Sequence, residues 1–148
     1  MTDSTTDLNG QVYLFLNGIE EAGHNGLRLV IQVGAVSAEA ENIQIGGSVI
    51  SGLRQVSVGK SGPEYEITFA SYIAYAIRNE SYVLQDKEEA WVGKSFRVYS
   101  KSRFLDFVRS ATLASPEYPG AFAHYSLVCQ DHVVDIASVS QPKIERLR

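Results

Sequence analysis

The sequence predicts an α+β protein: a strongly bent antiparallel sheet, or an open barrel, of about seven strands with one main helix at residues 102–115. Most apolar residues recur with the period of two that is typical of β-strands. Only one segment has the wide apolar stripe of an amphipathic helix. Glycine (12 residues) outnumbers proline (4 residues), which suits a chain with many turns.

The length and composition indicate a single soluble domain over residues 1–148. No apolar run approaches the ~20 residues needed to cross a bilayer. Residues 1–10 have neither the basic start nor the apolar core of a signal peptide, so we expect a flexible N-terminal lead-in. The single cysteine, Cys129, cannot form an internal disulfide and gives no sign of an oxidising compartment. We therefore expect a cytoplasmic protein.

The first part of the chain reads as short strands separated by turns. Residues 11–17 are apolar on both faces, which is typical of a strand covered on each side. Residues 27–36 show the cleanest alternation in the chain. The expected elements are strands at 11–17, 27–36, 43–45 and one or two within 48–58, a polar loop at 38–42 and a break at 59–63.

The stretch at residues 65–82, YEITFASYIAYAIRNESY, fits both a strand and a helix. Its odd positions are mostly aromatic or β-branched, and no capping residue precedes it, so the strand is favoured. A straight strand of this length would exceed a small domain, and we expect a bend near Ala70 and Ser71. The predicted core face contains Phe69, Ile73 and Ile77.

The second part of the chain contains the main helix between strands. A polar loop is expected at 86–90 and a strand at 94–99. Ser100 or Ser102 can cap the helix, which ends before Pro116. Two strands follow, at 122–129 and 132–139, joined as a hairpin or continuous as one long bent strand. The apolar stripe of the helix consists of Phe104, Leu105, Val108, Ala111 and Thr112.

No motif specifies a chemistry, and we assign no catalytic residue, cofactor or metal. Pairing of the hairpin strands would place His124 opposite Ala137 and His132 opposite Cys129, so the two histidines would not share a metal. Contact between Cys129 and His132 would unite a nucleophile with a base, but the flanking residues form no cysteine-protease signature. A buried thiol is the favoured interpretation of Cys129.

The net charge of −4 is scattered along the chain, which disfavours nucleic-acid binding and is compatible with a basic protein partner. We expect no membrane partner, and an exposed strand edge leaves a homodimer open.

Polar and aromatic groups gather near the end of the 65–82 stretch. The cluster at residues 78–80 follows an apolar strand, where scaffolds often present functional groups; an Arg78–Glu80 ion pair around a turn is the plainer interpretation. Tyr72 protrudes from a face of small residues that either a partner or the helix could cover. The predicted partner-binding residues are Tyr72, Arg78, Glu80, Tyr82, Asp86, Glu88 and Glu89.

Two functions remain open. In size, charge and fold class the sequence is similar to the toxin-neutralising immunity proteins of bacteria, which implies a non-catalytic protein that covers a protein partner. The alternative is a small-molecule-binding or enzymatic domain with its site in a cupped sheet. The residues predicted for that second site are Tyr75, His124, His132 and Asp135.

Overall fold

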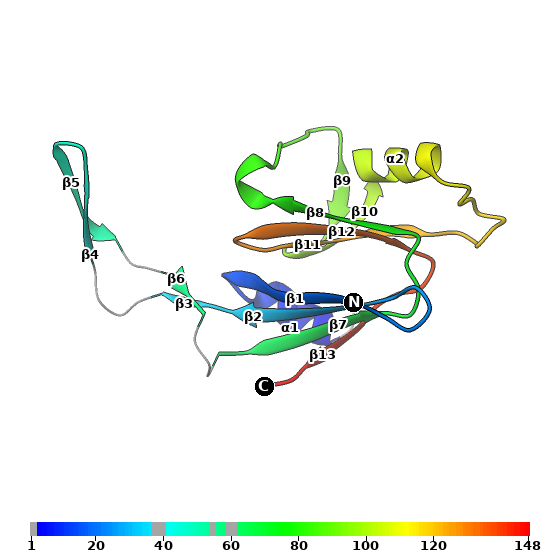
Figure 1. Ribbon diagram of the computed structural model, residues 1–148, viewed down its shortest axis with the longest axis horizontal. Helices are drawn as coiled ribbons and strands as arrows, with labels where there is room; N and C mark the ends of the chain where they lie inside the picture. The colour runs from blue at the N-terminus through cyan, green and yellow to red at the C-terminus, as the bar shows by residue number, and fades with distance from the viewer. Residues whose placement is uncertain (1–2, 37–40, 54–55, 59–61) are drawn as a thin grey trace.

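Two antiparallel sheets stacked face to face form the body of the protein in the computed structural model, which describes residues 3–36, 41–53, 56–58 and 62–148 (Figure 1). The four-stranded sheet has the order β1-β2-β7-β13, and its strands are β1 (Leu14–Ala22), β2 (Gly26–Val33), β7 (Glu64–Phe69) and β13 (Lys143–Arg146). The five-stranded sheet has the order β8-β12-β11-β10-β9, and its strands are β8 (Ala74–Asn79), β9 (Ala90–Val92), β10 (Phe96–Lys101), β11 (Ala123–Val128) and β12 (His132–Ser138).

The predicted α+β class is confirmed, with antiparallel pairing throughout the two sheets. The strands are divided between a sheet of four and a sheet of five, where the sequence indicated one sheet of about seven. In the described residues both sheets are bent and each ends in edge strands, so neither closes into a barrel.

The core fills the space between the sheets. In β2, every second residue points inward, and Leu27, Leu29 and Ile31 are fully buried. Phe69 from the four-stranded sheet meets Tyr125 from the other, with ring centroids 5.4 Å apart. The predicted strand at 27–36 is thus confirmed as β2 followed by the short β3 (Ala35–Val36).

The stretch at 65–82 is extended, as predicted, but it is two strands in different sheets. The chain leaves the four-stranded sheet after Phe69 and crosses to the other within four residues. The crossing is held by hydrogen bonds from the Tyr72 amide to the Asn25 carbonyl, 2.8 Å, and from the Ile73 amide to the Ala137 carbonyl, 2.7 Å. Since β8 begins a new register at a sheet edge, Ile77 is exposed and its predicted core position is wrong.

The flexible lead-in expected at residues 1–10 is wrong for residues 3–10, because Asp3–Gly10 forms helix α1. Leu8 is fully buried in the core. The Asn9 side chain fixes the helix end: its Oδ1 accepts hydrogen bonds from the amides of Lys94, Ser95 and Phe96, at 2.8–3.1 Å, and its Nδ2 donates to the Phe96 carbonyl. One side chain therefore joins α1 to the turn before β10.

The main helix and the final hairpin agree with the sequence. Helix α2 spans Arg103–Ala111 and is capped by Ser102; it ends four residues before the predicted boundary. It lies over the outer face of the five-stranded sheet and buries Leu105 and Val108 (Figure 1). The hairpin pairs His124 with Ala137, the predicted register.

A two-stranded arm extends from one end of the body (Figure 1). Its strands are β3 paired with β6 (Val56–Ser57), and β4 (Glu41–Ile45) paired with β5 (Ser48–Leu53). The strands predicted at 43–45 and within 48–58 are confirmed. The loop expected at 38–42 and the break expected at 59–63 lie largely outside the described residues.

Substitution Asn9→Ala removes four hydrogen bonds, three of which are partly buried. We expect it to lower the free energy of unfolding by about 2–4 kcal/mol. Urea denaturation followed by circular dichroism measures the change. Asn17→Ala, at an exposed position of β1, is the matched control and should stay within about 0.5 kcal/mol of the parent. A loss for Asn9→Ala no larger than that of the control would contradict the anchoring role.

Candidate functional site

Polar side chains from four elements meet on the outer face of the five-stranded sheet, beneath α2 and the segment 80–92. They are Ser102 at the start of α2, His124 on β11, Asp135 on β12 and Arg78 on β8. In the sheet register Asp135 is the diagonal neighbour of His124, since His124 pairs with Ala137 two positions further along the strand. Both side chains therefore lie on the same face.

These side chains form a continuous chain of hydrogen bonds. Ser102 Oγ lies 2.7 Å from His124 Nδ1, and His124 Nε2 lies 2.8 Å from Asp135 Oδ1. Arg78 donates to the other carboxylate oxygen, Asp135 Oδ2, from Nε at 3.2 Å and from Nη2 at 3.0 Å. Ser102, His124 and Asp135 are buried, and the Arg78 side chain is half-exposed.

The proton positions follow from the partners. Ser102 Oγ accepts the Leu105 amide at 3.0 Å as the helix cap, so its own proton points to His124 Nδ1. His124 then carries its proton on Nε2 and donates to Asp135. The Tyr99 ring stacks on the imidazole with centroids 4.4 Å apart, and Phe104 packs against it at 4.8 Å. The imidazole is therefore fixed in orientation.

Asp135 is ionised although it is buried. Burial alone would raise the pKa of its carboxyl group, but the hydrogen bond from His124 and the charge on Arg78 outweigh that effect. The pKa of Asp135 is therefore held below its usual range. A buried carboxylate of this kind stabilises the fold only while its partners remain in place.

The order Ser–His–Asp is that of a hydrolytic triad, but the serine cannot act as a nucleophile in this arrangement. Ser102 is only 2% exposed, and its oxygen is already engaged by the Leu105 amide. A nucleophile must reach the substrate carbonyl, and a side chain that is buried and already hydrogen-bonded on both sides is poorly placed to do so. The chain of hydrogen bonds instead attaches α2 to three strands of the sheet.

The four residues predicted for a small-molecule site do not form one cluster. His124 and Asp135 are in contact, but Nδ1 of His132 lies 3.0 Å from Asp131 Oδ2 at the end of the hairpin. Tyr75 is elsewhere, donating to Glu21 at 3.4 Å. The thiol of Cys129 is buried, and burial raises its pKa well above the usual range, so it is not a thiolate at neutral pH.

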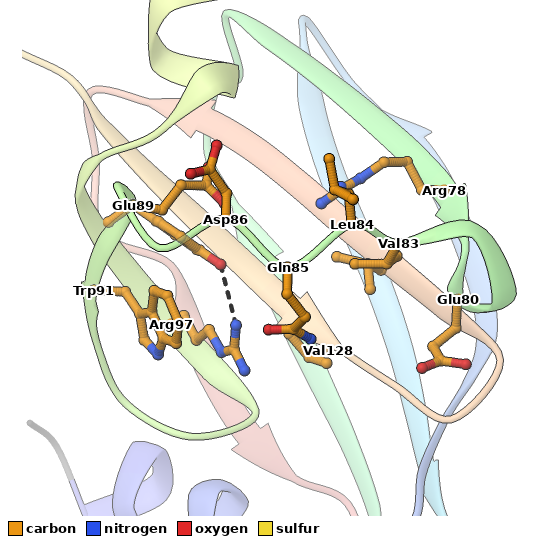
Figure 2. A pocket seen from close by; sticks show the side chains of 12 residues that line it. Arg78, Glu80, Val83, Leu84, Gln85, Asp86, Glu89, Trp91, Arg97 and Val128 are labelled. Atoms are coloured by element: carbon orange, nitrogen blue, oxygen red, sulfur yellow. Dashed lines mark hydrogen bonds between the residues drawn. The ribbon is translucent and has the colours of Figure 1, made fainter.

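A small cavity of about 90 Å³ lies beside this network, between the sheet and the segment 80–92 (Figure 2). Arg78 and Arg97 face it from the sheet, and Glu80, Asp86 and Glu89 from the covering segment. The volume is well below the range of about 300–1,000 Å³ that organic ligands usually occupy. A second pocket of about 270 Å³ adjoins it and reaches Arg78 and Asp135 of the network.

The covering segment is held by its own polar contacts. Asn79 Oδ1 accepts the Ser81 amide at 3.0 Å and caps the 3₁₀ turn η1 (Glu80–Tyr82). Asp86 Oδ1 accepts the Glu88 amide at 2.9 Å, and its Oδ2 forms an ion pair with Arg103. Both contacts lower the pKa of Asp86, the amide most.

Two further contacts fix the end of this segment. Glu89 Oε2 accepts the Arg103 amide at 3.1 Å, which joins the segment to α2. The Arg97 guanidinium lies 4.3 Å above the centre of the Trp91 ring and donates to the Tyr99 hydroxyl at 3.2 Å (Figure 2).

Large apolar side chains protrude from this ordered segment. Tyr82 is 85% exposed, Leu84 75%, Val92 66% and Trp91 39%. Glu80 and Glu88 of the same segment are also exposed. Leu84, Trp91 and Val92 were not among the predicted site residues, although a leucine within a polar loop is a recognisable signal.

Six of the seven residues predicted to bind a partner lie in this region. The Arg78–Glu80 ion pair considered from the sequence is replaced by Arg78–Asp135. Tyr72 lies apart: its hydroxyl donates to Glu21, which raises the pKa of Tyr72 to about 12, and its ring meets Tyr75 edge-on. Those six residues are Arg78, Glu80, Tyr82, Asp86, Glu88 and Glu89.

Among the described residues, no three His, Cys, Asp or Glu side chains are grouped so that they could hold a metal ion. Neither helix in the described ranges has the length and apolar character needed to span a membrane. No protein-family model, curated protein or solved structure matches this chain.

Substitution Asp135→Asn tests the buried network. Because the pKa of Asp135 is lower in the folded state than its unfolded value of about 3.9, the unfolded state binds more protons at acidic pH. The stabilisation is therefore complete above pH ~4 and is lost as the pH falls through the lower folded pKa. We expect the variant to lose about 2–4 kcal/mol at pH 7 and to show a flatter decline between pH 5 and 2.

Urea unfolding at a series of pH values measures both effects. Asp106→Asn is the matched control, since Asp106 is exposed on α2 and its ion pair with Arg109 is long, at 3.9 Å. If the free energy of unfolding of Asp135→Asn fell with pH as steeply as that of the wild type, the Asp135 carboxylate would not be the source of the pH dependence.

Proposed function

We propose that the protein is a non-catalytic binding protein that covers a protein partner with the outer surface of the segment 80–92. We call this the 80–92 surface, and it consists of Glu80, Tyr82, Leu84, Glu88 and Trp91. The partner is basic where it meets this surface.

The observation that carries the proposal is the exposure of three large apolar side chains on a segment that is otherwise fixed. Single exposed apolar residues are ordinary on a protein surface. Here Tyr82, Leu84 and Trp91 fall within ten residues. Trp, Tyr and Arg are the residue types that contribute most at protein interfaces, and Arg97 supports Trp91 from below.

Order in the segment favours binding because little conformational entropy is lost when a partner docks. Asn79, Asp86 and Glu89 each accept a backbone amide, and Arg103 pairs with Asp86. Loops held in their bound conformation bind more tightly than mobile ones of equal contact area. The polar contacts of the segment thus hold its exposed apolar side chains in place before a partner binds.

The acidic groups of this surface have different roles. Asp86 is neutralised by Arg103, and Glu89 accepts the amide of the same residue, so both are structural. Glu80 and Glu88 are exposed at the rim of the surface. Charges at an interface rim mainly steer association, and these two favour a basic partner.

Within this proposal, the specific role is that of a bacterial cytoplasmic immunity protein that blocks a basic toxin. The support is the combination of a non-catalytic α+β body with a preformed apolar and acidic surface. Steric cover requires neither a cofactor nor an active site. Co-expression with toxins encoded beside the gene tests this role, and growth of the host indicates neutralisation.

Substitution Leu84→Asp places a charge at the centre of the 80–92 surface. We expect it to weaken partner binding by at least about 30-fold, which corresponds to the loss of roughly 2 kcal/mol typical of a central interface residue. The partner is captured from a lysate of the native host, and its affinity is then measured with both purified proteins. Leu147→Asp, at an exposed leucine outside this surface, should bind normally. Equal affinity of the two variants would place the partner elsewhere.

Substitution Glu88→Lys reverses a rim charge and keeps the backbone amide of residue 88 that donates to Asp86. We expect the association rate with the partner to fall about 2- to 10-fold at low ionic strength and the dissociation rate to change little. Stopped-flow or surface-binding kinetics at two salt concentrations measure both rates. An unchanged association rate at low salt would exclude Glu88 from the interface.

A further inference from the structure

A larger cavity, of about 480 Å³, opens between the two sheets. Phe96 and Val98 of β10 and Tyr125 of β11 line one side, and Ile144 of β13 lines the other. Thr5 of α1 also lines it. This volume is within the range of about 300–1,000 Å³ occupied by small-molecule sites.

The walls of this cavity are fixed parts of the fold. Phe96 is 4% exposed, Tyr125 6% and Ile144 9%, and all three belong to the core. The Phe96 and Tyr125 rings stack with centroids 6.0 Å apart, and the Phe96 amide is bound by Asn9 at 2.8 Å. Residues placed in this way cannot move inward to close the space without losing core contacts.

The Tyr125 hydroxyl is the unusual group at this site. Within the part of the chain that the structure describes, no group is hydrogen-bonded to it. Burial raises the pKa of Tyr125, so the phenol is neutral and can donate a hydrogen bond. The hydroxyl lines the cavity and is open to it, so it can donate to an acceptor on a molecule bound there.

The lining also determines the charge of a ligand. Phe96, Val98, Pro142 and Ile144 are apolar, and Thr5, Tyr125 and Gln141 are polar but uncharged. An ionised ligand would lose its hydration without gaining a counter-charge, which is unfavourable. A neutral ligand meets no such cost.

We propose that this cavity binds an uncharged, largely apolar molecule whose carbonyl or ether oxygen accepts a hydrogen bond from Tyr125. The site is independent of the proposed partner binding. Phe96 and Val98 point to the inner side of the sheet, whereas Arg97 and Tyr99, which alternate with them, point to the outer side and the 80–92 surface.

The test uses N-phenyl-1-naphthylamine, an uncharged dye whose fluorescence rises in apolar sites, with the full-length protein. We expect saturable binding, and displacement by 2-nonanone at a concentration at least about 10-fold lower than by nonanoate at pH 8, because the carboxylate must be desolvated. Tyr125→Phe should raise the Kd of 2-nonanone about 3- to 10-fold, the effect of one hydrogen bond, and leave the Kd of the dye within about twofold.

Two variants locate the site. Val98→Trp fills the cavity, and Gln141→Trp blocks its mouth from an exposed position that does not endanger folding. Both should abolish dye binding, while Phe107→Trp, at an exposed position of α2 over the outer face of the sheet, should retain it. The proposal is overturned if the wild-type protein does not bind the dye, if Gln141→Trp binds it as well as Phe107→Trp does, or if nonanoate competes as effectively as 2-nonanone.

Discussion

The hydrogen bonds of His124 are the interaction on which the outer half of the structure depends. They join the cap of α2 to the carboxylate of Asp135, which in turn holds Arg78 at the sheet edge. The α2 helix then presents Arg103 to Asp86 and Glu89, and these two contacts fix the covering segment. A single buried imidazole therefore links the β-sandwich to the surface on which we place partner binding.

Local periodicity was sufficient to predict the elements whose burial is one-sided. The strand at 27–36 and the helix with Leu105 and Val108 have one inward face each, and their patterns show it. The predicted hairpin register also implies the contact between His124 and Asp135, because diagonal neighbours share a face.

Other features depend on contacts that are distant along the chain. The stretch at 65–82 alternates in the same way whether its two halves lie in one sheet or in two, so the crossing after Phe69 has no local signal. Likewise, Leu8 is one apolar residue in a polar segment, and Asn9 binds amides that lie more than eighty residues away. The order of the N-terminal helix comes from that docking and not from helix propensity.

The arm between β2 and β7 has a consequence for the evolution and folding of this chain. The chain leaves the sandwich after Val33 and returns at Glu64, where Gln32 and Glu64 are paired and the Val33 amide donates to the Pro63 carbonyl at 2.9 Å. The two ends of the arm are thus held together by the pairing of β2 with β7. Doubling the length of a flexible loop adds only about 0.6 kcal/mol of closure entropy, so this insertion can lengthen or shorten with little effect on stability. Its greater effect is on the folding rate, since β2 and β7 must find each other across it.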